Sequence, residues 1–389
     1  MSKLEELIQQ YCPDGVEFVP LSSIGTIRRG NGLQKKDFVK SGVGCIHYGQ
    51  IYTKFGAFAE KTLTFVNEEL ASHLLHIETG DLVIACTSEN VEDVCKAVAW
   101  LGEDTIVTGG HSCVLHHNQN PKYVAYFFQT ESFQSQKRKY AYGTKVIDIK
   151  PDNIGKIVIP VPPLPVQEEI VRILDNFTEL QAELQAELQK RKLQYNYYLD
   201  NLLNFNRGGY QAEVRWMKMS DVCNSVCSGK NRIKKPNGEY PVFGSTGIIS
   251  YCDKYAFDKT QILVARVGAN AGYVQIANNK YDVSDNTLII DLRKDIEINL
   301  KYVYYILRYI NLNKYAKGGG QPLITAGELK KISIPIPAFS EQQRIVSILD
   351  RFDALTTDLT AGLPAEIEKR RQQYEYYRDK LLTFKRKAA

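Results

Sequence analysis

The sequence predicts a mixed α+β protein, in which two strand-rich globular domains are separated by long helices that pair as an antiparallel coiled coil. Hydrophobic residues recur at three- and four-residue spacing over residues 167–205, with no Gly or Pro inside. The same pattern returns over residues 342–384. Short strand-like runs separated by Gly and Asn precede each helical stretch. Two copies of one plan in a single chain indicate an internal repeat with pseudo-two-fold symmetry.

Size and composition are those of an ordinary globular protein. The chain has 389 residues, of which 44% are hydrophobic and 24% charged, so it can hold two domains. The N-terminal sequence MSKLEELIQQ lacks the apolar core of a signal peptide, and no apolar run is long enough to cross a bilayer. We therefore expect a cytoplasmic protein without a membrane partner. The net charge of +5 permits nucleic acid as a partner without requiring it.

The cysteine and histidine pattern argues against a metal site. Eight cysteines in a chain of this kind are expected to be free thiols rather than a disulfide framework. His111, Cys113, His116 and His117 cluster, but they lie in the alternating apolar run SCVLHH, which predicts a strand. A zinc site there is the less favoured alternative, and we expect no metal-binding residues.

The first half of the chain is expected to contain a short helix, a strand-rich domain and a long helix in that order. The short helix lies within residues 1–15. The runs IGTIRR, GCIHYGQIY, GDLVIACTS and HSCVLHH are strand-like, and a helical segment over 121–140 interrupts them. The proline-rich run over 160–165 is expected to continue neither strand nor helix and to form a stiff connector into the long helix.

The second half repeats this order. QILVARVGAN stands where DLVIACTSEN stood, and KYVYYILRYI stands where KYVAYFFQTE stood. The lead-ins and heads of the two helices match at an offset of 175 residues. The chain thus divides into a first domain (1–163), a central helix (164–209), a second domain (210–337) and a distal helical region (338–389). The helices resemble each other residue by residue whereas the domains diverge, so we expect the helices to share one task and the domains to differ in what they contact.

The two helical stretches differ at one place. Gly362-Leu363-Pro364 is a stop–start signal, so the distal stretch should form two shorter helices. The central helix instead repeats the unit AELQ over 182–189, and one further unit would lengthen it by about 6 Å while rotating it by only about 40°. The residues expected to pack in the coiled coil are Ile170, Leu174, Phe177, Leu184, Leu188, Ile345, Leu349 and Phe352.

Basic loops at matching places in both domains suggest duplex DNA as the partner. An antiparallel helix pair would relate the domains by a pseudo-two-fold axis, which the DNA backbone shares, and two unlike domains would recognise a split, asymmetric sequence. Basic residues interleaved with aromatics and glycines suit phosphate contacts, and a few other polar side chains suit base edges. The candidate DNA-binding residues are Arg28, Arg29, Lys35, Lys36, His47, Tyr48, Gln50, Lys137, Arg138, Lys139, Lys145, Lys230, Arg232, Lys234, Lys235, Arg266, Asn270, Lys314 and Lys317.

The duplicated helix signatures resemble a known family. The heads QEEIVRILDNF and QQRIVSILDRF and the tails KRKLQYNYYLDNLLNF and EKRRQQYEYYRDKLLTF are similar to the conserved regions of the DNA-specificity (S) subunit of Type I restriction–modification systems. The resemblance covers the whole chain and makes 1–163 and 210–337 the two target recognition domains. It also likens the AELQ units to short central repeats whose number is associated with target spacing in one branch of that family.

The resemblance implies a subunit without catalytic activity that binds no cofactor itself. Such a subunit bridges two modification (methyltransferase) subunits, and the complex methylates adenine N6 within a bipartite target using S-adenosylmethionine. Restriction subunits add an ATP-dependent nuclease that uses Mg²⁺. The subunit-interface candidates that the resemblance implies are Tyr195, Tyr197, Tyr198, Tyr374, Tyr376 and Tyr377, with coiled-coil packing as an equal alternative for Tyr195 and Tyr374.

Enzyme motifs are missing from the sequence. Its one Pro-Pro, at Pro162-Pro163, lacks the polar acceptor and the aromatic ring of an amino-methyltransferase turn. There is no GxGxxG at a strand–helix junction and no GxxxxGK[ST] loop. We therefore predict no catalytic residues. Two alternatives stay open: a stand-alone DNA-modifying enzyme with no recognisable motif, and a coiled-coil interaction scaffold without a DNA role.

Overall fold

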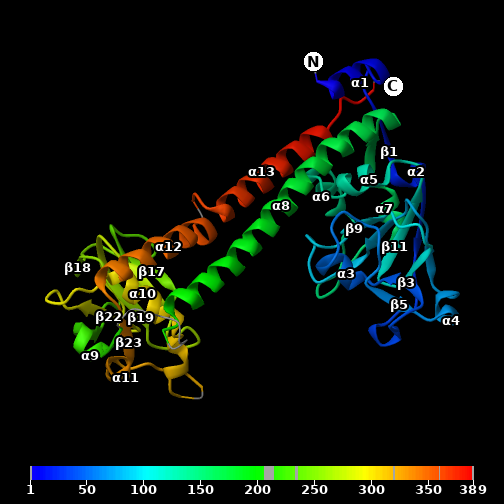
Figure 1. Ribbon diagram of the computed structural model, residues 1–389. Helices are drawn as coiled ribbons and strands as arrows, with labels where there is room; N and C mark the ends of the chain where they lie inside the picture. The colour runs from blue at the N-terminus through cyan, green and yellow to red at the C-terminus, as the bar shows by residue number, and fades with distance from the viewer. Residues whose placement is uncertain (1, 206–213, 233–234, 319, 359, 388–389) are drawn as a thin grey trace. The chain divides into compact units, whose positions relative to one another are not determined.

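The chain folds into two compact units, each with its own core. The computed structural model describes residues 2–205, 214–232, 235–318, 320–358 and 360–387 (Figure 1). Unit 1 comprises Met1–Leu184 and Ile367–Ala389, and unit 2 comprises Gln185–Glu366. Both are rich in strands, and the long helix α8 (Leu164–Leu203) contributes its first part to unit 1 and its second part to unit 2. The predicted mixed α+β class with long helices is confirmed. In the described residues, no helix combines the length and the apolar character of a membrane span.

Unit 1 is built on a five-stranded sheet in the order β2-β11-β7-β9-β4, with a four-stranded sheet, β5-β3-β10-β6, beside it. The two-stranded sheets β1-β13 and β12-β8 complete the strand set. Its elements are α1 (Lys3–Tyr11), β1 (Glu17–Pro20), α2 (Leu21–Ile24), β2 (Gly25–Arg29), η1 (Lys35–Asp37), β3 (Val43–Ile46), α3 (Tyr48–Thr53), β4 (Phe58–Ala59), β5 (Thr64–Val66), α4 (Glu68–Ala71), β6 (Leu75–Ile77), β7 (Leu82–Ala85), β8 (Thr87–Ser88), β9 (Ala97–Trp100), β10 (Ile106–Thr108), β11 (Ser112–His117), α5 (Pro121–Phe127), α6 (Glu131–Lys137), β12 (Ile147–Asp148), α7 (Pro151–Gly155), β13 (Val158–Val161), the first part of α8, and most of α13 (Leu363–Leu381).

The central strand β7 of unit 1 is buried on both faces. Leu82 and Ile84 point into the core that α5, α6 and α8 cover, whereas Val83 and Ala85 point into a second core shared with β3, β6 and β10. Successive side chains of a strand point to opposite faces, so a continuous apolar run satisfies both cores. This explains why LVIA carries no alternation in the sequence.

Unit 2 repeats this plan with fewer strands. Its sheets have the orders β15-β22-β19-β20, β17-β16-β21-β18 and β14-β23. Its elements are the second part of α8, β14 (Arg215–Lys218), α9 (Met219–Val222), β15 (Cys223–Ser228), β16 (Tyr240–Gly244), β17 (Gly247–Cys252), β18 (Phe257–Asp258), β19 (Gln261–Ala265), β20 (Val274–Ala277), β21 (Lys280–Val283), β22 (Thr287–Leu292), α10 (Leu300–Tyr309), η2 (Leu312–Tyr315), α11 (Ala326–Lys331), β23 (Ser333–Ile336) and α12 (Phe339–Thr357).

The internal repeat extends to individual hydrogen bonds. In unit 1 the Tyr123 hydroxyl donates to the carbonyl of Pro160 at 2.8 Å, and in unit 2 the Tyr302 hydroxyl donates to the carbonyl of Pro335 at 2.8 Å. The amide of Asn120 likewise donates to Gln167 Oε1 at 3.0 Å, and that of Asn299 to Gln342 Oε1 at 2.8 Å. In each unit the helix after the main sheet is fixed in the same way to the lead-in of a long helix.

Aromatic contacts pair the long helices in each unit. In unit 1 the ring of Phe177 on α8 lies 6.5 Å from Tyr374 and 5.6 Å from Tyr377 on α13. In unit 2 the ring of Phe352 on α12 lies 6.1 Å from Tyr195 on α8. Partner numbers fall as residue numbers rise along α8, which is the contact order of an antiparallel pair. Figure 1 shows α13 beside the first part of α8.

Several local predictions are confirmed and two are corrected. The N-terminal helix is present as α1, and the distal stretch is interrupted between α12 and α13 as Gly362 and Pro364 predicted. The single helix expected over 121–140 is in fact two, α5 and α6, because the Thr130 hydroxyl accepts from the amide of Phe133 and starts a new helix. Of GCIHYGQIY only the start is strand, since His47 caps the helix α3.

The proline-rich run is not a separate connector. Pro160 lies inside β13, which pairs only with β1, so its missing N–H does not interrupt a central strand. Pro165 lies in the first turn of α8, where the amide has no helical partner in any case. One cysteine pair also departs from the expectation of free thiols, since Cys86 and Cys113 form a disulfide. The other six cysteines are free.

Candidate nucleic-acid interface

One end of the main sheet of unit 2 brings together loops that are far apart in the sequence. Strand β22 is antiparallel to both β15 and β19, so the first residue of β22 lies at the same end as the last residues of the other two. The amide of Gly229 donates to the carbonyl of Thr287 at 3.0 Å, and that of Arg266 to the carbonyl of Asn286 at 3.0 Å. The amide of Ile324 in turn donates to the carbonyl of Arg266 at 2.8 Å. We call this end, formed by residues 229–232, 266–272, 284–287 and 317–324, edge 2.

The corresponding end of unit 1 has the same backbone frame. The amide of Gly30 donates to the carbonyl of Ser112 at 3.0 Å, and that of Cys86 to the carbonyl of His111 at 2.9 Å. The amide of Ile149 donates to the carbonyl of Cys86 at 3.0 Å. We call this end, formed by residues 29–35, 86–88, 109–112 and 142–149, edge 1. Three bonds of edge 2 therefore have three counterparts in edge 1.

A glycine in each edge lets two loops approach closely. A Cβ atom at Gly30 would lie 2.5 Å from the carbonyl oxygen of Gly109. At Gly229 it would lie 2.2 Å from the carbonyl oxygen of Val283. Both distances are far below a van der Waals contact, so only glycine fits. The GNG and SGK loops that looked flexible in the sequence are thus tightly packed backbone.

A polar cavity of about 430 Å³ adjoins edge 1 and collects aromatic and basic residues. Its lining includes Lys35, His47, Tyr48 and His111, with the Tyr48 ring 4.5 Å from His47 and 4.7 Å from His111. His47 Nδ1 accepts from the amide of Gly49 at 3.2 Å. Burial lowers the pKa of His47, and the charges of Lys35 and His111 lower it further. The cavity therefore presents an uncharged imidazole beside a lysine, a combination that suits a polar base edge next to a phosphate.

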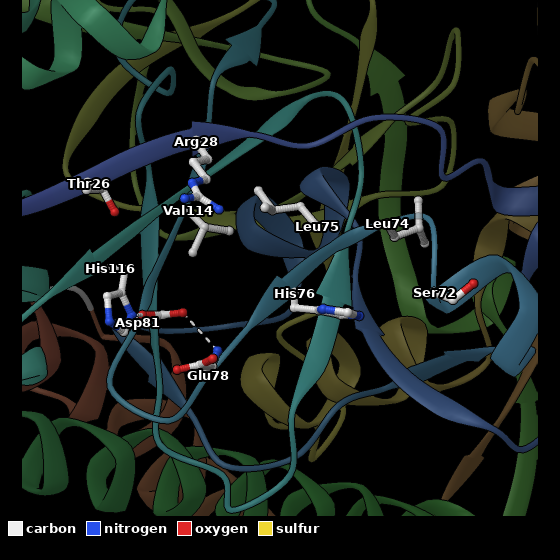
Figure 2. A pocket seen from close by; sticks show the side chains of 10 residues that line it. All are labelled: Thr26, Arg28, Ser72, Leu74, Leu75, His76, Glu78, Asp81, Val114 and His116. Atoms are coloured by element: carbon white, nitrogen blue, oxygen red, sulfur yellow. Dashed lines mark hydrogen bonds and ion pairs between the residues drawn. The ribbon is translucent and has the colours of Figure 1, made fainter.

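A second cavity of about 480 Å³ lies on the other face of the same sheet (Figure 2). Figure 2 shows Arg28 and Val114 side by side on neighbouring strands, with His116 against Asp81. His116 Nδ1 lies 2.7 Å from Asp81 Oδ1, and the other carboxylate oxygen accepts from the amide of Glu78 at 2.8 Å. Two carboxylates in one cavity oppose a phosphate. Arg28 lies there because alternate residues of β2 face opposite sides of the sheet, which separates it from Arg29.

Several predicted DNA contacts lie exposed around the two edges. In unit 2, Arg232 lies within edge 2 and pairs with Asp285 at 3.3 Å while remaining 85% exposed. Lys317 pairs with Glu328 at 2.6 Å and is 80% exposed. Lys235, outside the edge, pairs with Asp253 at 2.8 Å. Such exposed pairs hold little free energy and exchange readily for phosphate contacts. The other predicted residues with exposed positions are Lys35, Lys36, Lys139, Lys145, Lys230, Asn270 and Lys314.

Other predicted residues are engaged inside the protein. Arg29 makes two bonds to Asp148, at 3.1 and 2.6 Å, which raise its pKa. Arg138 pairs with Glu131 at 2.8 Å. Gln50 holds the start of α3, since its Oε1 accepts from the amide of His47 at 2.9 Å. Lys234 lies outside the described residues.

Lys137 corrects the prediction made from the basic run Lys137-Arg138-Lys139. Its side chain is buried, and its ammonium group donates to the carbonyls of Glu92 and Val94, each at 2.9 Å. Burial lowers its pKa to about 8. This lysine supports the loop before β9 and does not reach a phosphate.

The clustered histidines and cysteine of β11 do not form a metal site. His111 Nδ1 lies 3.0 Å from Thr87 Oγ1, His116 faces Asp81, and Cys113 is in the disulfide. His117 is buried, and burial lowers its pKa to about 4. Among the described residues, no three His, Cys, Asp or Glu side chains are placed to hold a metal ion.

The tyrosine clusters of the long helices divide into inward and outward members. Tyr195 and Tyr374 are buried, whereas Tyr197 is 66% and Tyr376 61% exposed. Tyr198 lies over the ring of Phe352 at 5.2 Å, as Tyr377 does over Phe177. The outward tyrosines leave each helical pair with an exposed aromatic surface. All eight residues expected to pack in the coiled coil lie on α8 or α12, and Ile170, Leu174, Ile345 and Leu349 are completely buried.

Sequence reasoning missed the residues that line the edges between the basic loops. His111, Ser112, Asn286 and Thr287 stand at the starts of β11 and β22, and nothing in their local sequence marks them. The offset between the repeats, applied to strand ends instead of to the helices alone, would have paired them.

Comparison with known proteins identifies related sequences. Residues 13–191 and 212–369 match the family described as Type I restriction modification DNA specificity domain. The chain is 37% identical over 296 residues to the Type I restriction enzyme EcoR124I/EcoR124II specificity subunit of Escherichia coli, which covers 68% of this chain and 70% of that protein. It is 33% identical over 249 residues to the EcoprrI specificity subunit of Escherichia coli, covering 60% of this chain and 62% of that protein.

Solved structures share the fold. The S subunit of a Type-I restriction-modification system from M. genitalium has a TM-score of 0.60 at 14% identity, covering 95% of this chain and 96% of that one. A chain from a study of complex assembly and conformational transition of a type I R-M system has a TM-score of 0.59 at 17% identity, covering 95% and 97%.

Proposed function

The chain belongs to the Type I restriction modification DNA specificity family, and from that premise we propose that it gives such a system its DNA sequence by recognising a bipartite, asymmetric target with a fixed gap. Its role is recognition without catalysis. Each unit contacts one half-site through its sheet edge and the adjoining loops. The continuous helix α8, at 40 residues, keeps the two half-sites a constant distance apart.

The observation that carries this proposal is the likeness of frame and unlikeness of side chains at edges 1 and 2. Three backbone bonds recur at equivalent places. The residues held by them differ: Cys86 against Arg266, and His111 against Asn286. A duplicated frame with exchanged side chains suits two modules that bind the same kind of ligand and discriminate different sequences. A plain interaction scaffold gives no reason to keep basic loops at the same sheet end twice.

We further propose that the exposed tyrosines Tyr197 and Tyr376 contact two modification subunits, one on each helical pair. Restriction subunits join them in the full complex. S-adenosylmethionine, ATP and Mg²⁺ are used by those partners and are not held by this chain. The complex works in the cytoplasm, where the host DNA is. Aromatic side chains that are half or more exposed on a rigid helix are the residue type enriched in protein interfaces.

Reconstitution with its modification subunits and sequencing of methylated adenines in genomic DNA tests the proposal. The expected result is one motif of two unlike half-sites with a constant gap. Filter binding of that motif should weaken steeply with added salt, since phosphate contacts release counterions. Methyl transfer by the purified chain alone would favour the stand-alone enzyme, and absence of salt-dependent DNA binding by the complex would favour the interaction scaffold.

A further inference from the structure

Arg266 occupies a position whose fold does not require arginine. Its amide donates to the carbonyl of Asn286 and its carbonyl accepts from the amide of Ile324, at 3.0 and 2.8 Å. Cys86 makes the equivalent two bonds in unit 1, at 2.9 and 3.0 Å. The frame thus accepts a small side chain at this place, and the guanidinium of unit 2 needs another explanation.

The guanidinium of Arg266 has no carboxylate partner among the residues that the structure describes. Its Nε is buried without a hydrogen-bond partner, and Nη1 makes one long bond of 3.4 Å to the carbonyl oxygen of Asp285. The Asp285 carboxylate pairs with Arg232 instead. Elsewhere in unit 2, Arg293 and Arg308 each have an acidic partner. A partly buried, unpaired cation is costly unless a ligand supplies the missing acceptors.

Unpaired polar atoms gather at the same edges. Six buried side-chain nitrogen or oxygen atoms lack a partner in the described part of the chain. Three of them belong to edge 2, namely Arg266 Nε, Ser284 Oγ and Thr287 Oγ1, and a fourth is Ser112 Oγ of edge 1. Buried polar groups in folded proteins are nearly always paired, so this concentration points to a surface that is completed by a ligand.

We propose that Arg266 is a specificity-determining residue that recognises a guanine in the half-site bound by unit 2. This rests on the proposed function. The planar guanidinium matches the O6 and N7 acceptors of guanine in the major groove, which is the commonest specific contact in protein–DNA complexes. Its backbone is fixed on both sides, and the carbonyl of Asp285 orients one end, so the fork is preorganised. A phosphate contact suits Lys230 and Arg232 better, because they are exposed.

Unit 1 cannot make the same contact, because Cys86 stands in place of Arg266 and is held in the disulfide with Cys113. The inference therefore predicts different base requirements at equivalent positions of the two half-sites. His111, which is exposed at edge 1 where Asn286 stands in edge 2, is the corresponding unit 1 residue to vary.

The experiment uses the reconstituted complex with Arg266→Ala and Arg266→Lys, and reads methylated motifs by genome-wide sequencing. The expected result is that one G·C requirement in one half-site relaxes about 10- to 100-fold in both variants, while the other half-site and the gap stay unchanged. Lysine retains the charge but not the fork, so a charge-only role predicts full rescue by Arg266→Lys. Thermal unfolding should match the wild type, since unit 1 accepts cysteine at this place.

Two matched variants separate the alternatives. Arg232→Ala, on the same edge, should weaken binding of all sequences equally and lower the salt dependence. His111→Ala should alter only the other half-site, which assigns each half-site to its unit. An Arg266→Ala complex that keeps the full base requirement, or that loses affinity uniformly, overturns the inference. A wild-type complex without a bipartite motif overturns the proposed function itself, so the two failures are distinguishable.

Discussion

The carboxylate of Asp175 on α8 lies 2.7 Å from the ammonium group of Lys122 on α5, both about one-quarter exposed. The other oxygen of Asp175 accepts from the Tyr126 hydroxyl at 2.6 Å. Burial, together with this bond, raises the pKa of Tyr126. One carboxylate therefore joins the long helix to the helix that covers the main sheet of unit 1.

Unit 2 contains the same three residues in the same arrangement. Asp350 on α12 lies 2.6 Å from Lys301 and accepts from the Tyr305 hydroxyl at 2.7 Å, both on α10. Two separate copies of this network indicate that the orientation of each long helix on its domain is fixed by it.

Asp175→Ala and Asp350→Ala should each lower the free energy of unfolding by about 2 kcal/mol. Each removes an acceptor that a lysine and a tyrosine share, and bonds to charged groups contribute about 1.5–3 kcal/mol. Denaturant titration measures the loss. Glu131→Ala is the matched control, because its pair with Arg138 is more than half exposed on both sides. It should change stability by less than about 0.5 kcal/mol. Equal effects in all three variants would remove the claim that the network fixes the helices.

The buried tyrosines Tyr374 and Tyr195 should respond differently to loss of their hydroxyl. Tyr374 bonds to Gln129 Oε1 at 3.0 Å, whereas the Tyr195 hydroxyl has no partner in the described residues. The residue corresponding to Gln129 in unit 2 is Arg308, which turns instead to Tyr304 at 2.7 Å. Tyr374→Phe should cost about 1 kcal/mol, and Tyr195→Phe should be neutral or stabilising. Chemical denaturation of the two single variants decides this, and an equal cost would contradict it.

His117 should make stability fall as the pH drops from about 6.5 to 4. Burial lowers its pKa to about 4, so the unfolded chain binds a proton in this window and the folded chain does not. Its contribution is fully present above pH 6.5 and is lost as the pH falls through 4. The loss is on the order of 2 to 3 kcal/mol at about 1.4 kcal/mol per pKa unit. His117→Asn keeps an acceptor for the amide of Gln119 and should flatten the slope measured by thermal unfolding at each pH.

The long helices could be predicted from sequence because their periodicity reflects one apolar face. Ile170 and Leu174, four residues apart, are both completely buried, and so are Ile345 and Leu349. The edges could not be predicted in the same way. Arg266 and Cys86 correspond only when the register of β19 on β22 and of β7 on β11 is known, and the local sequences share no letters there.

The basic run Lys137-Arg138-Lys139 shows a second limit. Consecutive helical residues point about 100° apart, so one member of a charged run can face the core while its neighbours face solvent. The sequence gives the three charges but not the rotation of α6. Only the carbonyls of Glu92 and Val94, more than 40 residues earlier, reveal which lysine is internal.

Lys35 and Lys137 should therefore differ in what their loss changes. Lys35→Gln, in the cavity beside edge 1, should weaken DNA binding for all sequences and lower the salt slope of log K by about 0.9. Lys137→Met should leave the salt slope unchanged and lower the free energy of unfolding by about 2 kcal/mol, because two carbonyls lose their donor. Filter binding at several salt concentrations, with denaturant titration of the same samples, measures both. A reduced salt slope for Lys137→Met would restore it as a phosphate contact.

Adding one AELQ unit after Gln189 should widen the gap between the half-sites. The insertion lengthens α8 by about 6 Å and rotates it by about 40°, and 6 Å corresponds to nearly two base-pair steps. Leu184 and Leu188 are one unit apart, and Leu188 is buried, so a further unit repeats an existing packing position. An inserted AQLE of the same length should give the same gap, since length sets the distance. A three-residue insertion rotates the helix by about 60° the other way and should weaken packing. Methylome sequencing that finds an unchanged gap after the AELQ insertion would contradict a spacing role for α8.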